Sequence, residues 1–334
     1  MYNMLMAGND QDLMISVAVD YYEKDLSQKE IAEKYKISRV TVSSYLKRSR
    51  QEGIVDIRVN KKPSLAFSLQ TELQSCLVME KVMVCTSDSD ETRTRIIVGR
   101  AASDLLKSRL HDDITIGISY GTTLYETVHQ LIVRRHFKGV QVVQLLGAMG
   151  SRDPMQDGFE LARTLSAKVD GTYRIIQAPL VVQNEHLKEM LLNEPQIAAV
   201  MQLARSADMA VLGVSSNRPE ISGIVRAGFL SSEESARLYE EGAVGNVCGM
   251  HFDVHGEILP LSMNSRTIAI EPAELRAIPL RIAVACGIRK ADAILGAIRA
   301  GFANALVTDT DAALTMISLI KAGDQAPKAP GHTR

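Results

Sequence analysis

The amino-acid sequence predicts an α/β protein with a small all-α helix-turn-helix unit followed by a larger domain built on a mostly parallel, doubly wound sheet. Two observations support this division. Residues 34–62 carry nine basic and two acidic side chains, a net charge of +7 in a chain whose total is −1. From residue 81 onward, short β-branched segments alternate with helical ones, a pattern typical of parallel sheets covered on both faces.

Composition limits the class of protein. Of 334 residues, 46% are hydrophobic and 23% charged, which indicates a globular chain of two or three domains. Aromatic residues make up only 4%, so the core must be aliphatic. The scattered cysteines, expected to be buried thiols in a reducing cytosol, are Cys76, Cys85, Cys248 and Cys286. No signal peptide or 18-residue apolar segment is evident, so we expect a cytoplasmic protein without a membrane partner.

The first 62 residues are predicted to form a DNA-binding domain. Residues 1–12 are polar and expected to be frayed, and the helical pattern begins at residue 13. Ser27 and Glu30 form a potential capping box for a second helix. A three-residue turn at 36–38 leads to a third helix capped by Ser38. The turn has Lys36 where glycine is common, which costs some energy if the residue is left-handed.

The predicted third helix has the character of a DNA-reading helix. No acidic residue occurs between residues 34 and 51. A small apolar core is expected from Ile31, Ala32, Ile37, Val42 and Leu46. The candidate contacts to bases or phosphates are Gln28, Arg39, Thr41, Ser43, Ser44, Lys47 and Arg48. The alternatives are a three-helix bundle with a solvated basic face, or a unit for protein contacts, which the acid-free helix disfavours.

The remaining chain is divided by changes of pattern. Residues 54–59 alternate like a short strand, and Pro63 ends that unit. Leucines at 65, 69, 73 and 77 predict a connecting helix within residues 63–80. Residues 81–322 are expected to form the large domain, and residues 323–334, rich in Pro, Gly and Lys, a disordered tail.

Strands and helices alternate along the large domain. Strands are predicted at 82–85, 114–119, 140–146, 174–176, 209–214, 282–285 and 305–307. Helices are predicted at 93–110, 124–133, 160–168 and 291–299. Residues 247–258 are expected to form a hairpin that turns at 253–256.

Small and polar residues follow several predicted strands. In an open α/β sheet such loops meet where the strand order reverses, and ligands bind there. The first loop, 117–124, combines glycines with Thr122 and Thr123 at a helix start, which suits a phosphate but also caps ordinary helices. The candidate ligand-binding residues are Gly117, Ser119, Gly121, Thr122, Thr123, Gly147, Gly213, Ser215, Asp253 and Lys290.

Two of these candidates have plain alternatives. Lys290 begins a predicted helix, where a cation is disfavoured unless it pairs with an anion or is simply solvated. Asp253 could hold sugar hydroxyls or be an ordinary turn residue. His251, Asp253 and His255 would share a strand face only if the hairpin stayed extended, so no metal or other cofactor is predicted.

Two regions of the chain resemble the SorC family of bacterial sugar-responsive transcription regulators. The first comprises Leu26-Ser27-Gln28, Ile31-Ala32 and Ile37-Ser38-Arg39 with Thr41-Val42-Ser43 and Leu46-Lys47-Arg48. The second comprises residues 245–256, which read GNVCGMHFDVHG, residues 281–290, and Leu306-Val307-Thr308-Asp309. The resemblance covers roughly residues 13–322. Asn246 stands where Asp is common in the family, and Ser44 where the reading helix often has Arg.

The resemblance implies a regulator that binds a sugar without turning it over, on a fold like that of sugar-phosphate isomerases and deaminases. Gly121, Thr122 and Thr123 would hold a phosphate, Asp253 the sugar hydroxyls and Lys290 an anionic or carbonyl end. A homodimer or homotetramer on a palindromic operator is implied. We therefore expect a carbohydrate-operon regulator controlled by a sugar or sugar phosphate; the alternative is a DNA-tethered sugar-phosphate isomerase or hydrolase.

Overall fold

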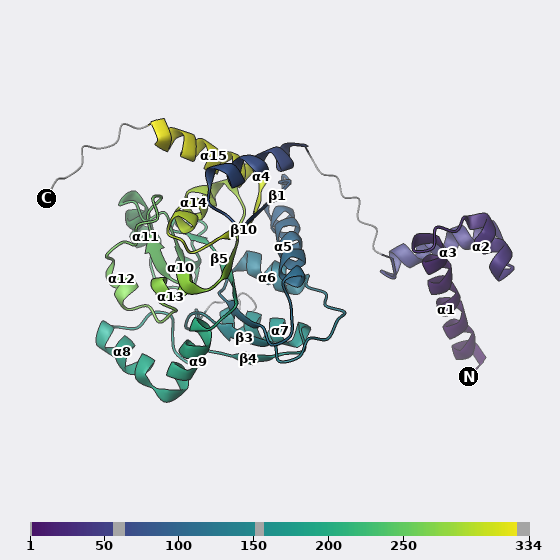
Figure 1. The fold of residues 1–334 in the computed structure, drawn as a ribbon, viewed down its shortest axis with the longest axis horizontal. Helices are drawn as coiled ribbons and strands as arrows, with labels where there is room; N and C mark the ends of the chain where they lie inside the picture. The colour runs from purple at the N-terminus through teal and green to yellow at the C-terminus, as the bar shows by residue number, and fades with distance from the viewer. Residues whose placement is uncertain (1, 56–63, 151–156, 326–334) are drawn as a thin grey trace. The chain divides into compact units, whose positions relative to one another are not determined.

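A computed structural model describes residues 2–55, 64–150 and 157–325 of the chain. The chain divides into two compact units, Met1–Lys62 and Pro63–Arg334. Each unit has a hydrophobic core of its own, and each is described separately below (Figure 1).

The first unit is a bundle of three helices: α1 Tyr2–Tyr22, α2 Gln28–Tyr35 and α3 Arg39–Gln51. The helix begins at Tyr2, so the expectation that residues 1–12 are frayed is wrong for residues 2–12. Its core consists of Val17, Ile31, Val42 and Leu46, with the predicted Ala32 and Ile37 packed against them. The Ser27 and Glu30 capping box is confirmed. Lys36 is left-handed, with φ 55°, and ends α2 before the turn.

A buried carboxylate joins α1 to α2. The side chain of Asp20 is 1% exposed. Its two oxygens accept hydrogen bonds from Lys34 Nζ at 2.6 Å, Tyr35 Oη at 2.7 Å and Lys24 Nζ at 2.9 Å. Together these bonds hold the pKa of Asp20 well below its usual range, with Lys34 the largest cause. The carboxylate therefore stays charged at neutral pH and fixes the end of α2 against α1.

The second unit is built on a parallel sheet. Its strands are β1 Lys81–Cys85, β2 Thr115–Ile118, β3 Gln141–Gln144, β4 Thr172–Arg174, β5 Met209–Gly213, β9 Leu280–Val284 and β10 Ala305–Asp309. Among the described residues they form one seven-stranded sheet in the order β1-β10-β9-β5-β2-β3-β4, with every pair parallel. All seven overlap the predicted strands. The order reverses between β2 and β5, which places a topological switch point there.

Helices cover both faces of this sheet, as its apolar strands require. Beneath one face, α5 Glu91–Ser108, α6 Thr122–His129 and α7 Gly158–Lys168 share a core with the sheet. On the other face lie α4 Ser64–Cys76, α9 Pro195–Arg205, α14 Ala291–Arg299 and α15 Thr310–Gln325. In Figure 1 α4 and α15 run side by side, in agreement with their contacts. The remaining helices are α8 Glu185–Asn193, α10 Gly223–Arg226, α11 Ser232–Glu240, α12 Ser262–Ser265, α13 Pro272–Ala277 and the 3-10 turn η2 Ile288–Lys290.

A small antiparallel sheet packs beside α14. It consists of β6 Ser215–Ser216, β7 Gly245–Val247 and β8 Met250–Phe252. The chain turns first at Cys248 and Gly249, both with positive φ, between β7 and β8, a turn that the sequence did not predict. The predicted turn at 253–256 is confirmed, because Phe252 and Ile258 pair across it in an antiparallel bridge. Residues 253–256 form a second turn, in which Gly256 N donates to Asp253 O at 3.1 Å.

Several boundary predictions need correction. Helix α4 belongs to the second unit and packs on β1 and α15 through Leu69 and Leu73, whereas Leu65 is exposed. Helix α15 continues to Gln325, so residues 323–325 are helical; the rest of the predicted tail lies outside the described residues. Ile54 and Val55 are not in a strand, and residues 56–59 also lie outside the described residues. Only Cys248 is buried among the cysteines, and Cys76 is exposed.

Removing the Asp20 charge should destabilise the first unit. A carboxyl group whose pKa is lowered in the folded state stabilises the fold above its unfolded pKa of about 4, and this contribution is lost as the pH falls. Asp20→Asn should therefore lower the opening free energy of α2 by about 1–2 kcal/mol at pH 7. The variant's opening free energy should also decrease less than that of the wild type as the pH falls into the acid range. Amide hydrogen exchange of α2 measures both. Asp12→Asn, at an exposed position of α1, is the control; equal exchange in the two variants would contradict the assignment.

Candidate functional site

Helix α3 presents a polar stripe that is free of acidic side chains. Arg39, Ser43 and Lys47 follow one another at intervals of four residues and are all exposed, so they share one face of the helix. Ser44 is exposed beside them. Val40 is 79% exposed on the same N-terminal half, and the sequence interpretation missed it. An exposed apolar side chain among hydrogen-bonding groups is the type that contacts a thymine methyl group.

The other three predicted DNA contacts are less available. Arg48 forms ion pairs with Asp10 at 3.0 Å and Glu52 at 3.2 Å. The Thr41 hydroxyl is 2.8 Å from the Ser38 hydroxyl, within the cap of α3. Gln28 is half-buried at the start of α2. The free surface is therefore centred on Arg39, Ser43 and Lys47 of α3.

A cavity of about 340 Å³ lies in the second unit at the carboxyl ends of the parallel strands. A narrower recess continues it between β2 and β5, at the switch point, and the two share Thr122, Thr123, Arg226 and Lys290. The sheet order thus brings together segments that are far apart in sequence. Their meeting point is the place where ligands bind in folds of this class.

One wall of the cavity is the start of α6, the helix that follows β2. Gly121 has φ 127°, a conformation that favours glycine, and no side chain caps the helix. Within the described residues no side chain caps the first-turn amides of α6, and Thr122 and Thr123 line the cavity beside them. A helix start with free amides and adjacent hydroxyls suits an anion such as phosphate.

Positive side chains without an anionic partner line the same wall. Lys290 Nζ donates to the Val214 carbonyl at 3.1 Å, and in the described part of the chain it has no carboxylate partner. Burial lowers the pKa of Lys290, and the charges of Arg226 and Arg95 lower it further. A desolvated ammonium beside two guanidinium groups creates a positive potential that a bound anion would relieve.

The opposite wall carries carboxylates, which the sequence interpretation did not select. Asp309, 1% exposed at the end of β10, accepts hydrogen bonds from Ser87 Oγ at 2.7 Å and Gly287 N at 2.8 Å. Asp88 and Asp311 line the cavity beside it. Asp309 could have been found, since it directly follows a predicted strand. Arg226 could not, because its helix α10 reaches the cavity only through the tertiary fold.

The ten predicted ligand-binding residues divide into two groups. Gly121, Thr122, Thr123, Gly213, Ser215 and Lys290 line the cavity or its inner recess. The remaining four lie in packed or turn positions outside its walls. A Cβ at Gly117 would approach Leu145 Cδ2 to 2.6 Å, and one at Gly147 would approach the Pro179 carbonyl to 2.6 Å, so both glycines allow close packing. Ser119 Oγ is buried and accepts a hydrogen bond from Gly213 N at 2.9 Å.

Asp253 stabilises a turn in this structure. Its carboxylate accepts hydrogen bonds from the amides of His255 and Glu257, both at 2.9 Å. The carbonyl of Asp253 packs against Gly296, in the second half of α14. Lys290 stands at the other end of that helix, before its first residue. The turn-residue interpretation therefore describes its position better than a place in the cavity wall.

The neighbouring histidine is part of a buried polar network. His251 Nδ1 lies 2.9 Å from Asn217 Nδ2, and Asn246 Nδ2 donates to Asn217 Oδ1 at 3.2 Å. Burial lowers the pKa of His251 to about 4, so the ring is neutral at physiological pH. No cluster of three or more His, Cys, Asp or Glu side chains within the described residues could hold a metal ion.

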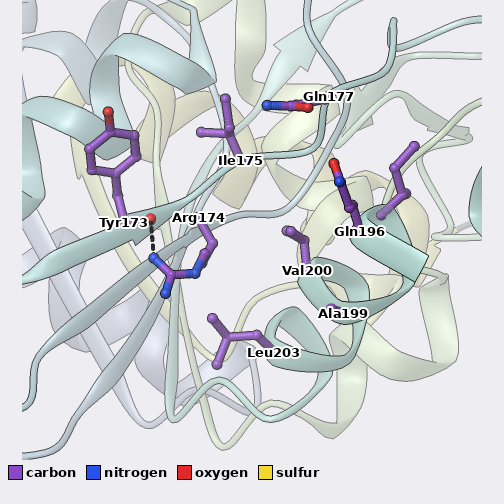
Figure 2. Close-up of a pocket in the computed structure, with 9 residues that line it drawn as sticks. Tyr173, Arg174, Ile175, Gln177, Gln196, Ala199, Val200 and Leu203 are labelled. Atoms are coloured by element: carbon purple, nitrogen blue, oxygen red, sulfur yellow. Dashed lines mark hydrogen bonds between the residues drawn. The ribbon is translucent and has the colours of Figure 1, made fainter. Parts of the chain in front are cut away.

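A second cavity, of about 370 Å³, lies at the outer edge of the sheet (Figure 2). The end of β4 and the residues that follow it form one wall, and Ala199, Val200 and Leu203 of α9 form the other. Arg174 is its one charged lining residue in the described chain, and it donates to the Tyr173 carbonyl at 2.9 Å. This cavity is slightly larger than the one at the carboxyl ends of the strands, but it is mostly apolar. The cavity at the strand ends, with its recess at the switch point, is called the switch-point cavity below and is the better candidate for a polar ligand.

Comparisons with known proteins agree with both units. The family model of the sugar-binding domain, Sugar-bind, matches residues 61–318, and the model of Sigma-70, region 4, matches residues 16–52. The chain belongs to the SorC family of transcriptional regulators. The two models match different units, Sugar-bind the α/β domain and Sigma-70, region 4, the helical head.

Relatives support this membership along nearly the whole chain. The deoxyribonucleoside regulator of Bacillus subtilis is 30% identical over 94% of this chain and 99% of its own length. The sorbitol operon regulator of Klebsiella pneumoniae is 28% identical over 92% of this chain and 98% of its own. The crystal structure of full-length SorC from Klebsiella pneumoniae matches with a TM-score of 0.84 and 27% identity, covering 92% of this chain and 99% of that one.

The part of the chain that the structure describes contains no helix with the length and hydrophobicity needed to cross a membrane.

Replacing Lys290 should separate stability from ligand binding. A desolvated cation without an anionic partner opposes folding, since its pKa is lowered in the folded state and the penalty persists at every pH where it is charged. Lys290→Met should therefore leave the unliganded thermal midpoint equal or higher, and abolish any rise caused by inorganic phosphate. Differential scanning calorimetry measures both. Lys188→Met, which breaks an ion pair with Glu271 outside the cavity, is the control and should lower the midpoint while keeping the phosphate response.

Proposed function

We propose that this chain is a cytoplasmic regulator of a carbohydrate operon whose affinity for its operator is controlled by a sugar phosphate. Membership of the SorC family establishes the class of transcriptional regulator with a sugar-binding domain. The observation that carries the finer proposal is the switch-point cavity, where the start of α6 has no side-chain cap and Lys290 has no carboxylate partner among the described residues. That arrangement favours a phosphorylated ligand.

The reading surface is assigned to α3. Arg39 and Lys47 supply positive charge, Ser43 and Ser44 supply hydrogen bonds, and Val40 supplies an apolar contact. A helix with these groups exposed on its N-terminal half is suited to the major groove. Two heads in a homodimer or homotetramer would read a palindromic operator with half-sites one helical turn, or a multiple of it, apart.

Helix α15 offers a physical route from the cavity to the segment before the sugar-binding domain. The helix begins with Thr310 and Asp311, and Asp311 lines the cavity. The backbone amide of Asp311 donates a hydrogen bond to Ser87 Oγ at 3.0 Å. Its later turns pack on α4 through a shared apolar core, and Lys321 Nζ pairs with Glu72 Oε1 at 2.7 Å. Helix α4 is the first helix after residue 62. A ligand that moves α15 would therefore move α4 with it.

The alternative is a DNA-tethered isomerase or hydrolase. The cavity contains carboxylates and a lysine, but among the described residues no histidine lines it, and Asp309 is occupied by Ser87 and Gly287. The general base of such an enzyme must have a free side chain near the substrate, and among the described carboxylates Asp311 meets that condition. The choice therefore rests on the relatives, which are transcriptional regulators. We therefore propose binding without turnover, and sustained conversion of a bound sugar phosphate would favour the enzyme instead.

Alanine substitutions on α3 test the reading surface. Arg39→Ala and Lys47→Ala should each weaken operator binding by about 1–3 kcal/mol and leave ligand binding unchanged. Fluorescence anisotropy with operator DNA measures the first and calorimetry the second. Arg48→Ala is the matched control, because its guanidinium is already paired with Asp10 and Glu52 and should cost less affinity. Unchanged DNA affinity in the Arg39 and Lys47 variants would overturn the assignment.

A charge exchange tests the coupling route. Lys321→Glu should reduce the effect of the ligand on operator affinity by roughly two- to tenfold, while ligand binding and unliganded DNA binding stay close to normal. Adding Glu72→Lys restores an opposite pair at the same position and should recover the coupling. The measurement is the ratio of operator affinities with and without ligand. Failure of the double variant to recover coupling would show that this contact is not part of the route.

A further inference from the structure

The switch-point cavity is electrically polarised along the sheet. Its α6 end lies below β2, and its carboxylates follow β1 and β10. In the order β1-β10-β9-β5-β2, three strand spacings separate β10 from β2. At about 4.8 Å per spacing, the two ends are roughly 14 Å apart. This span accommodates a phosphate at one end and the remainder of a sugar or polyol along the cavity.

Opposite charges dominate the two ends. Near α6, Lys290 and Arg226 have no acidic partner among the described residues. At the β1 and β10 end, Asp309 is buried and fixed by Ser87 and Gly287, and Asp88 is half-buried. The other cations of the cavity do not cancel them. Arg289 is paired with Glu91 at 2.9 Å, and Arg95, which donates to Thr92 Oγ1 at 3.1 Å, is outnumbered by Asp88, Asp309 and Asp311.

Asp311 is the most available carboxylate of this end. It stands in the first turn of α15, is exposed, and lines the cavity. Its backbone amide is bound by Ser87, but its side chain has no ion pair or hydrogen bond within the described structure. An ionised carboxylate is an acceptor only, so it binds hydroxyl donors and repels a second anion.

We infer that the cavity selects a sugar or polyol monophosphate, with its phosphate at the α6 end and hydroxyl groups at Asp311 and Asp88, and discriminates against ligands with a second phosphate or a carboxylate at the far end. This inference rests on the proposed function, since it takes the α6 end as the phosphate site. It adds the polarity of the ligand and assigns Asp311 as a specificity-determining residue.

The physical reason is the reduced screening inside a cavity. Charges that line a partly enclosed site interact more strongly than charges in bulk water. A hydroxyl at the far end gains a charge-assisted hydrogen bond from Asp311 or Asp88. A phosphate or carboxylate in the same place gains none and meets three carboxylates, including Asp309. The difference falls on the far end alone, so the affinity for phosphate itself is unaffected.

Matched ligand pairs test the inference on the full chain. The pairs are glucose 6-phosphate with 6-phosphogluconate, fructose 6-phosphate with fructose 1,6-bisphosphate, and ribulose 5-phosphate with ribulose 1,5-bisphosphate. Inorganic phosphate is the separate probe of the α6 end. Titration calorimetry at low salt should show at least one monophosphate binding more tightly than inorganic phosphate, and more tightly than its doubly anionic partner.

The Asp311→Asn variant tests the residue. The amide keeps the size of the side chain and removes its charge at an exposed position with no partner, so the fold is retained. The ratio of the affinity for the monophosphate to the affinity for its doubly anionic partner should decrease by roughly two- to fivefold, as expected for one partly solvated charge. Glu189→Gln, the same change at an exposed residue of α8 outside the cavity, should leave the ratio at its wild-type value.

The outcomes separate the two proposals. If neither inorganic phosphate nor any ester binds, the phosphate site and the proposed function both fail. If phosphate binds but no monophosphate binds more tightly, the hydroxyl end is overturned and the phosphate site stands. If the doubly anionic partners bind as well as the monophosphates, or if Asp311→Asn leaves the ratio unchanged, the inference alone is overturned.

Discussion

The reversal of strand order between β2 and β5 is the constraint on which the function of the large domain depends. All seven strands of the large sheet are parallel in the described structure, so their carboxyl ends lie on one edge of that sheet. The connection from β2 leads to β3 on one side and that from β5 leads to β9 on the other, which leaves a recess lined by Thr122, Thr123 and Lys290. Two helical layers bury the faces of the sheet, so this edge is where polar side chains can converge. The charges of the cavity follow from that geometry.

Two features of the cavity matter for regulation. One is the positive charge of Lys290, and the other is helix α15, which runs from the cavity to α4 at the start of the domain. Lys290 loses solvent through burial, and in the part of the chain that the structure describes it donates to the Val214 carbonyl and to no carboxylate. Such a side chain costs stability in the unliganded protein and gains it on anion binding. On the other wall, α15 begins at Asp311 and packs along α4. Binding energy at one residue can therefore bias the position of a helix, which is what an effector-controlled regulator requires.

The head depends on a different interaction. Asp20 is buried and fastens α2 to α1 through Lys34 and Tyr35. This leaves α3 to expose Arg39, Ser43 and Lys47 without an acidic neighbour in its sequence. Arg48, which the charge pattern alone would place in the same surface, is instead held by Asp10 from the N-terminal part of α1. A pattern of charges along one helix does not reveal partners supplied by another.

The sequence by itself determined the division into two units, the capping box at Ser27, the left-handed Lys36, the seven strand segments and the glycine turn into a helix at Gly121, because these follow from local residue preferences and periodicity. Tertiary structure decided which loops meet. Gly117 and Gly147 pack against neighbours, and Asp253 closes a turn, although their sequences are as polar or small as those of cavity residues. Arg226, Asp88 and Asp311 reach the cavity through the tertiary fold, a long-range property that no local pattern encodes.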